Sequence, residues 1–186
     1  MNVFKTIEFN EPNKEQDRIS GGISGAITNP DSDEAINHAE LYYEEIRKMS
    51  TDVRKISKNT GFEFDAILMI KHYLFIDEHN LNGKIKRFEP SFEIAESWRR
   101  LAFDKKNIKP HDIILLKHEL KEMSLISQGI PQNQAHIITS KEYNYAKKSR
   151  DFYKTLHQEI KHRNDQISGA INFDDYKENK IWEERY

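Results

Sequence analysis

The apolar residues of this chain recur at intervals of three and four, which is the spacing that places side chains on one face of an α-helix. Two of these stripes consist of Ile36, Ala39, Tyr43 and Ile46, and of Ile94, Trp98 and Leu101. A hairpin is expected only near Asn82–Phe88, because Asn82-Gly83 is typical of a tight turn. The sequence therefore predicts an all-α fold: a compact multi-helix domain of about six helices, with at most one short β-hairpin and flexible termini.

Capping residues set the expected boundaries. Ser91 is a candidate N-cap, Pro110 is tolerated in a first helical turn, and Gly129 suits a helix end. A sixth helix is expected from Pro131 toward His162. We expect an N-terminal arm or linker over residues 1–30, a helical domain over 31–163 and a C-terminal tail over 164–186. The expected core comprises Ile36, Tyr43, Ile67, Ile70, Leu74, Ile94, Trp98, Leu101, Leu115, Leu116, Leu120 and Met123.

Composition excludes several classes of function. The 29 basic and 31 acidic residues give a net charge of −2, so there is no overall attraction to nucleic acid or to an anionic membrane. The absence of cysteine excludes disulfides, thiol catalysis and thiolate metal sites, so that any metal would be held by His, Asp or Glu. No signal peptide or apolar run of membrane-spanning length is visible. We therefore expect no membrane contact and a cytoplasmic location.

The segment Pro110–Glu119 carries two ionisable pairs on one expected helix. His111-Asp112 and His118-Glu119 are seven residues apart, which is close to two helical turns, so the pairs share one side of the helix. The residues between them are apolar, so this helix must be mostly buried and its charged side chains need partners, solvent or a chemical role. The candidate catalytic residues are therefore His111, Asp112, His118 and Glu119. In this interpretation an imidazole moves the proton, and the carboxylates orient it or hold a metal.

Each pair also has a purely structural interpretation. Asp112 near a helix N-terminus would satisfy free N–H groups, and His118 could be a buried histidine bonded to a neighbouring carboxylate. The spacing differs from His-Glu-x-x-His, which needs histidines at i and i+4, so that zinc-enzyme motif is absent. The sequence alone leaves both interpretations open.

Other residues could complete a site. A divalent metal is one cofactor that the histidines could hold, and the sequence does not identify it. The candidate metal ligands are His38, His79, His111 and His118. Arg99 and Lys117 are candidate substrate-binding residues for a phosphate group. Basic and aromatic residues interleave over Lys141–Tyr153, as on a surface that binds single-stranded nucleic acid, but an exposed helix face explains this pattern equally well.

Six short sequence words occur in a fixed order along the chain: His38–Tyr43, Asn59–Gly61, Asp77–Leu81, Phe88–Leu101, His111–Glu119 and Tyr143–Tyr145. Together they resemble a domain at the C-terminal ends of phage minor head proteins and of bacterial polymorphic toxins, mainly in Gram-positive bacteria. The resemblance implies a phage or prophage origin, a cytoplasmic or virion-associated location and an effector activity whose reaction it does not specify. The His and Asp residues also faintly resemble metal phosphohydrolases of the His-Asp type, whose distal Asp motif is not recognisable here.

Two classes of function follow. The first is a toxin-like effector enzyme, a hydrolase acting on nucleic acid or nucleotide through the His/Asp/Glu site. The second is a non-enzymatic module that binds a protein partner such as a phage head component, a host protein or an immunity protein, for which its near-neutral charge and aromatic content are suited. The enzyme interpretation expects His38, His111 and His118 to converge on one open groove, near His79.

Overall fold

The computed structural model of the chain describes residues 27–81 and 83–183, with side chains described as far as residue 166. The α-helices are α1 (Asp33–Lys48), α2 (Asp52–Thr60), α3 (Phe64–Lys71), α4 (Phe92–Phe103), α5 (Pro110–Ser127), α6 (Gln132–Glu142) and α7 (Tyr145–Glu183). The remaining elements are a π-helical turn, η2 (His72–Ile76), a 3-10 turn, η3 (Lys105–Asn107), and the strands β1 (His79–Leu81) and β2 (Lys84–Lys86). The structure is 75% helical, which confirms the predicted all-α fold with one short hairpin.

Helices α4 and α5 pack on each other, and between them they contact each of the other described α-helices. Helix α4 packs on α1, α2 and α5, and α5 packs on α3, α4, α6 and α7. Trp98 of α4 is fully buried, and its ring meets Phe75 edge-on at a centroid distance of 5.1 Å. Its indole Nε1 donates a hydrogen bond of 2.9 Å to Asp52, whose other carboxylate oxygen pairs with Lys71 at 2.8 Å. Trp98 is therefore a core anchor, as its place in the predicted stripe indicated.

The predicted core is confirmed except at one position. Ile36 is 49% exposed, so its assignment to the core was wrong. The buried stripe of α1 is instead Ala35, Ala39, Tyr42, Tyr43 and Ile46. Because successive helical residues are rotated by about 100°, Ile36 lies at the solvent edge of that stripe. Three of the other predicted core residues are half-buried and pack against the core: Ile94, Leu120 and Met123.

The hairpin forms where it was predicted. Strand β1 pairs with β2 in antiparallel register, with His79 opposite Lys86 and Leu81 opposite Lys84. Gly83 adopts a φ of 82°, which a glycine tolerates without steric cost, and its N–H donates to the Asn80 side chain at 2.9 Å. The turn chemistry of the sequence is therefore sufficient to place this hairpin.

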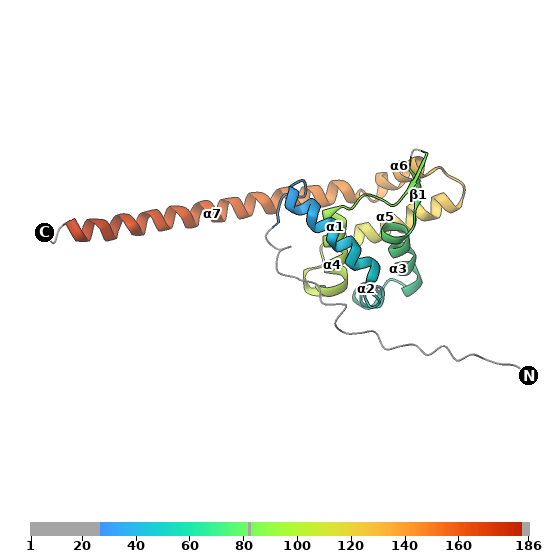
Figure 1. Ribbon diagram of the computed structural model, residues 1–186, viewed down its shortest axis with the longest axis horizontal. Coiled ribbons are helices and arrows are strands. Elements are labelled where there is room, and N and C mark those ends of the chain that lie inside the picture. The colour runs from blue at the N-terminus through green and yellow to red at the C-terminus, as the bar shows by residue number, and fades with distance from the viewer. Residues whose placement is uncertain (1–26, 82, 184–186) are drawn as a thin grey trace, which may run out of the picture.

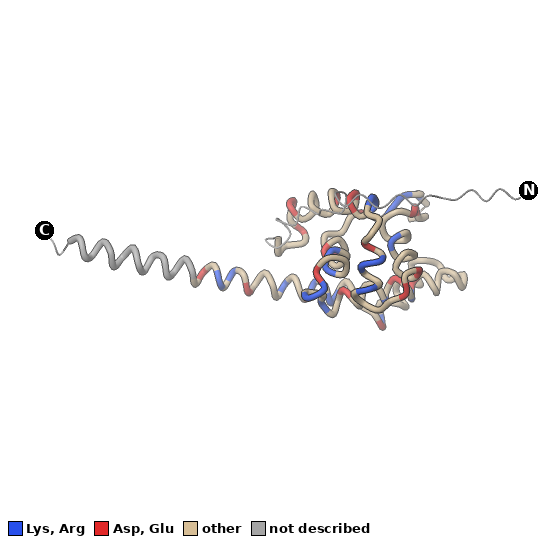
Figure 2. The backbone as a smooth tube through the Cα atoms, turned by 90° about the horizontal axis from the view of Figure 1, so that it is seen from below, with Lys and Arg blue, Asp and Glu red and all other residues tan. Residues whose placement is uncertain are grey.

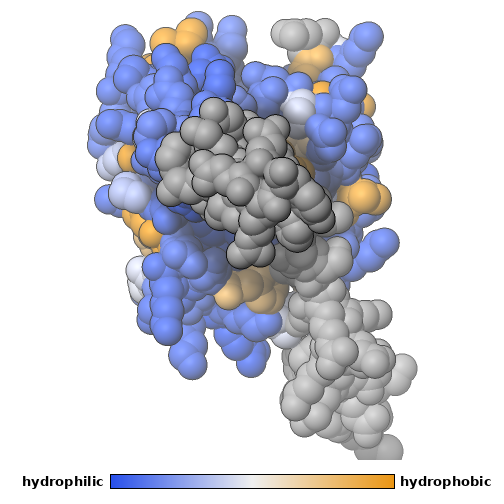
Figure 3. Space-filling view, turned by 90° about the vertical axis from the view of Figure 1, so that its left-hand side faces the viewer, coloured by the Kyte–Doolittle hydropathy of each residue, from blue (hydrophilic) through white to orange (hydrophobic). Residues whose placement is uncertain are grey.

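The C-terminal part of the chain differs from the expected single helix. Helix α6 ends at Glu142, and α7 begins at Tyr145 after a break at Tyr143. Helix α7 then continues to Glu183, across the expected start of the tail at residue 164, and projects beyond the other helices (Figure 1). Most of the expected arm over residues 1–30 lies outside the described residues. The face of the molecule on the α7 side is largely hydrophilic (Figure 3).

Within the described part of the chain, no helix combines the length and the apolar character that crossing a membrane would need.

Candidate functional site

The two ionisable pairs of α5 lie in two different environments. Seven residues bring His118 to the same side of the helix as His111, but they also move it about 10 Å along the helix axis. At the first position α5 packs on α4 and α7, and at the second it packs on α6. The expectation that both pairs share one groove is therefore not met, because neighbours change over this distance.

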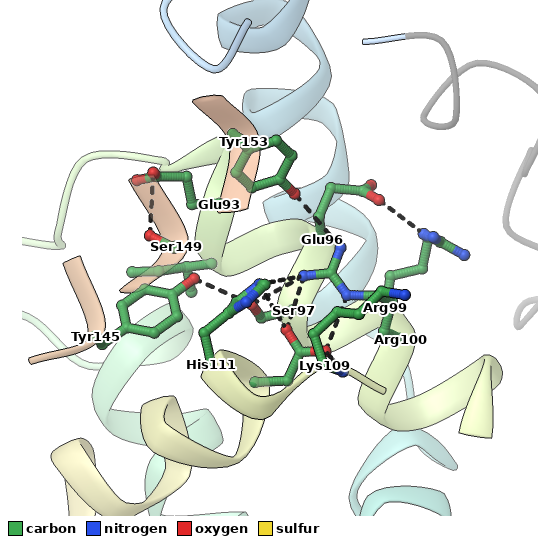
Figure 4. A network of polar contacts seen from close by, with 12 residues as sticks. Glu93, Glu96, Ser97, Arg99, Arg100, Lys109, His111, Tyr145, Ser149 and Tyr153 are labelled. Atoms are coloured by element: carbon green, nitrogen blue, oxygen red, sulfur yellow. Dashed lines mark hydrogen bonds and ion pairs between the residues drawn. The ribbon is translucent and has the colours of Figure 1, made fainter. Parts of the chain in front are cut away.

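The first environment is centred on Arg100 of α4 (Figure 4). Its guanidinium donates to both carboxylate oxygens of Asp112, from Nε at 2.9 Å and from Nη2 at 2.7 Å. The Lys109 backbone N–H also donates to Asp112, at 2.8 Å, which caps the N-terminus of α5. Asp112 is 0% exposed and Arg100 is 5% exposed. This is a buried ion pair that also fixes a helix end.

His111 belongs to the same buried network. Arg100 Nη2 donates to His111 Nε2 at 3.0 Å, so this nitrogen carries a lone pair and the imidazole is neutral. Burial, together with the nearby positive charges of Arg100 and Lys109, lowers the pKa of His111 to about 4 against the opposing effect of Asp112. Arg100 also donates to Tyr153 and Ser97, and the Ser97 hydroxyl contacts the Tyr145 hydroxyl at 3.0 Å. The observed role of His111 and Asp112 is thus to join α4, α5 and α7.

The second environment brings His118 together with Glu122 of α5 and His136 of α6, a cluster that we call the triad. His118 Nε2 lies 3.2 Å from Glu122 Oε2 and 3.3 Å from His136 Nδ1. His136 Nδ1 lies 2.8 Å from Glu122 Oε2. The three atoms form a compact group of the kind that can hold one metal ion.

The dimensions of the triad match those of a metal site. In a tetrahedral zinc site with bonds of about 2.0–2.1 Å, neighbouring ligand atoms are about 3.3 Å apart. Two of the three separations in the triad are 3.2 and 3.3 Å, and the third is 2.8 Å. Two histidines and one glutamate also form a ligand set found in catalytic zinc enzymes. The triad therefore needs only a small adjustment to bind a cation.

Outer hydrogen bonds fix the orientation of the triad. His118 Nδ1–H donates to the Tyr143 carbonyl at 2.7 Å, which leaves Nε2 to face the other two members. The Tyr73 hydroxyl donates to Glu122 Oε1 at 2.8 Å and accepts from Gln132 Nε2 at 3.2 Å. Bonds of this kind, from a histidine to a backbone carbonyl and to the distal oxygen of a carboxylate, support the ligands of known metal sites.

The same contacts set the charges of the triad. Burial alone would lower the pKa of His118, but the bonds to Glu122 and to the Tyr143 carbonyl raise it. Burial likewise opposes ionisation of Glu122, but hydrogen bonds from His118, Tyr73 and His136 lower its pKa. Glu122 is therefore a carboxylate, and its negative charge favours either a proton or a metal ion between it and the imidazoles.

Local sequence explains how the triad assembles. His118 and Glu122 are four residues apart on α5 and so lie on one face of the helix. Helix α5 ends at Ser127, and Gly129 then adopts a φ of 88°, which lets the chain reverse within a few residues. Helix α6 returns along α5 and places His136 beside the pair. Tyr73 reaches Glu122 from η2.

The triad opens into a groove of about 1030 Å³ between η2, the β1–β2 hairpin and α6. Glu122 and His136 line this groove together with Tyr73 and His79. His118 is 5% exposed and lies beneath, whereas the His136 side chain is 57% exposed. A metal in the triad would thus have protein on one side and the groove on the other.

Glu119 lies beside the triad and does not line the groove. It is 6% exposed, and burial raises its pKa to about 8, with His118 opposing the rise and Glu122 adding to it. At neutral pH this side chain is therefore largely protonated.

The other predicted site residues lie elsewhere. His38 donates to Glu96 at 3.0 Å and stacks on Tyr42, and Arg99 donates to the second oxygen of Glu96 at 3.0 Å. These bonds lower the pKa of Glu96 against the effect of burial, which would raise it. Lys117 is exposed on α5. None of these residues belongs to the triad.

His79 lies in the wall of the groove. It donates from Nε2 to the Tyr73 carbonyl at 2.7 Å, and its ring stacks on Phe88 at a centroid distance of 4.3 Å. It lines the same groove as Glu122 and His136 without being one of the three members of the triad.

Glu122 and His136 are not among the site residues predicted from the sequence. The zinc-enzyme motif requires two histidines at i and i+4, whereas the pair on α5 is His118 and Glu122 at that same spacing. The available signal was this His-x-x-x-Glu pair followed by a Gly-Ile-Pro turn and a second helix containing a histidine. An antiparallel return of that helix is enough to add the third group.

Comparisons with protein-family models, with curated proteins and with solved structures each found no match for this chain.

Proposed function

We propose that this domain is a metal-dependent hydrolase and that His118, Glu122 and His136 hold its divalent cation, most simply Zn²⁺. The observation that carries the proposal is the convergence of three ligand atoms within 3.3 Å of one another. The outer bonds from Tyr73 and to the Tyr143 carbonyl support it, because they orient Glu122 and His118 as outer hydrogen bonds orient the ligands of known metal sites.

The position of the triad favours catalysis over a structural metal. Structural zinc sites are usually closed by four protein ligands, whereas catalytic sites use three and keep one position for water or substrate. Here the described residues offer three ligands, and two of them line an open groove. A bound cation of this type lowers the pKa of its water to about 7, which supplies a hydroxide nucleophile at neutral pH.

The hydrolase class is the one expected from the sequence, but the site is now His118, Glu122 and His136 instead of the two ionisable pairs of α5. His111 and Asp112 are assigned to the buried Arg100 network, and His118 is retained as a metal ligand. A setting as a phage- or prophage-derived effector rests on the resemblance alone and remains part of the proposal.

The first experiment measures metal binding. Zn²⁺ is titrated into the metal-free full chain in a calorimeter, and His136→Ala is compared with His162→Ala, which changes an exposed histidine of α7. We expect one Zn²⁺ per wild-type chain, an affinity at least about tenfold weaker for His136→Ala, and no change for His162→Ala. Equal affinities of the wild type and His136→Ala would refute the triad as the binding site.

The second experiment measures hydrolysis with a simple activated ester, 4-nitrophenyl acetate. The Zn²⁺-loaded wild type should hydrolyse it faster than the chelator-treated protein and faster than Glu122→Gln at the same Zn²⁺ concentration. If the loaded wild type binds Zn²⁺ but is no faster than the variant, the site is a metal site without hydrolase chemistry.

A second candidate function is protein binding without catalysis. Its supporting observation is α7, which projects beyond the other helices and would be accessible to a phage, host or immunity protein (Figure 1). If both experiments above fail, this class becomes the better explanation.

A further inference from the structure

We infer that the substrate of this site is an extended polypeptide segment with apolar side chains rather than a nucleic acid. This inference rests on the proposed hydrolase function and adds the substrate class to it. It comes from three properties of the groove: its charge, its apolar wall and the strand along one side.

The charge of the groove disfavours a polyphosphate. Among the described residues that line it, none is Lys or Arg, and Glu78 and Glu122 are acidic. Nucleic-acid sites depend on basic side chains that neutralise phosphates, and each missing contact weakens binding. Acidic and basic positions are also interspersed over the described helices (Figure 2). A neutral or basic chain avoids the repulsion that a phosphodiester backbone would meet here.

The walls of the groove offer apolar contacts. Ile126 of α5, Ile137 of α6, Leu81 of β1 and Phe88 of the loop after β2 line it. Ile137 is 59% exposed although it is a large aliphatic residue in the middle of α6. Apolar walls with a few amide groups, here from Gln132 and Asn133, are the usual features of a site that binds an uncharged ligand.

The edge of strand β1 can align an extended ligand along the groove. All three residues of β1 line the groove, whereas no residue of β2 does, so the groove runs along β1. Among the described residues β1 pairs with β2 alone, which leaves its other edge without a strand. An extended peptide can add to such an edge through main-chain hydrogen bonds. A polypeptide is the ligand that suits all three properties: a groove without basic residues, its apolar walls and the edge of β1.

The reaction is then hydrolysis of a peptide bond. A cation held by His118, Glu122 and His136 would supply an activated water for addition to the carbonyl carbon. The C–N bond would break, and the two protons of the water would pass to the new carboxyl group and to the leaving amine. Water is the sole co-reactant, and no oxidant or reductant is needed.

The test compares substrates for the Zn²⁺-loaded full chain. One arm is a tryptic peptide digest of a bacterial lysate, with new termini identified by mass spectrometry, and the other arms are a single-stranded RNA and a single-stranded DNA. We expect cleaved peptides with Leu, Ile, Val or Phe enriched and Asp and Glu depleted around the cleaved bond, and intact nucleic acids. Cleavage of RNA or DNA, or ester hydrolysis without any peptide cleavage, would overturn this inference while leaving the hydrolase proposal in place.

A matched pair of variants on α6 tests the groove itself. Ile137→Asp places a charge in the groove, whereas Ile138→Asp changes an exposed neighbour that does not line it. The first should lower kcat/KM for a cleaved peptide at least about tenfold, and the second should leave it within about twofold. Equal effects of the two variants would show that peptides do not bind in this groove. If the wild type does not bind Zn²⁺ at all, the proposed metal-dependent hydrolase function is itself refuted.

Discussion

Replacing Arg100 by Met removes the guanidinium that neutralises Asp112 inside the protein. Asp112 is fully buried and would keep one hydrogen bond, from the Lys109 backbone N–H, after losing two charged bonds of 2.9 and 2.7 Å. The methionine would fill much of the volume of the arginine stem, so the main effect is electrostatic. The variant therefore isolates the role of this ion pair.

The expected cost is large. Each hydrogen bond to a charged group contributes about 1.5–3 kcal/mol, and breaking a buried ion pair by removing one partner costs about 3–5 kcal/mol. We adopt about 3–5 kcal/mol, which would lower the Tm of a chain of this size by roughly 6–20 °C. An exposed pair gives the matched comparison: Lys147→Met, which breaks the pair with Asp151, should cost less than about 0.5 kcal/mol.

The assay is urea unfolding followed by circular dichroism, with Zn²⁺ affinity measured on the same samples. The double variant Arg100→Met, Asp112→Asn should be more stable than Arg100→Met alone, because it no longer buries an unpaired charge. Zn²⁺ affinity of the folded variants should equal that of the wild type. A cost of Arg100→Met below about 1 kcal/mol, or a loss of Zn²⁺ binding in the folded variant, would refute the division of α5 into two independent environments.

Three further predictions concern stability. Trp98→Ala should lower the free energy of unfolding by about 3–5 kcal/mol in urea titrations, because it empties the centre of the core and leaves Asp52 without the indole donor; a change below about 1 kcal/mol would contradict this role. Because the pKa of His111 is about 4 in the folded chain against 6.5 ordinarily, its contribution to stability is complete above pH 6.5 and is lost as the pH falls toward 4, at a cost of no more than about 3.5 kcal/mol. His111→Asn should flatten that part of the stability–pH curve, and an unchanged curve would show that His111 is not the group responsible. Zn²⁺ at about 100 times its Kd should stabilise the wild type by about 2.7 kcal/mol in thermal unfolding but not Glu122→Gln, and equal stabilisation of both proteins would mean that the metal binds elsewhere.

Periodicity and capping were enough to predict most of the fold. Three local sequence features predicted elements that the structure contains: the stripe through Trp98, the first-turn proline Pro110 and the turn at Gly83. The assignment of Ile36 to the core was wrong because Ile36 borders the buried stripe of α1. A residue on that border can be buried or exposed, depending on which element packs against the helix. The break at Tyr143 was missed because the residues around it continue the helical pattern.

The candidate site was predictable only in part. Two residues seven positions apart lie on the same side of a helix but can pack against different neighbouring helices. The separate environments of His111 and His118 therefore could not be predicted without knowing where α6 and Arg100 lie. Glu122 and His136 became members of the site through the α5–α6 turn, which brings together residues 14 apart in sequence. The hydrogen bond from Tyr73, 49 residues from Glu122, depends on the tertiary fold alone.

The most direct test of the metal site is a crystal structure of the Zn²⁺-soaked protein with anomalous difference maps at the zinc edge. We predict one strong peak about 2.0–2.2 Å from His118 Nε2, His136 Nδ1 and a Glu122 carboxylate oxygen, with a water or hydroxide toward the groove. A triad without an anomalous peak at saturating Zn²⁺, or a peak held by other residues, would contradict the proposed site.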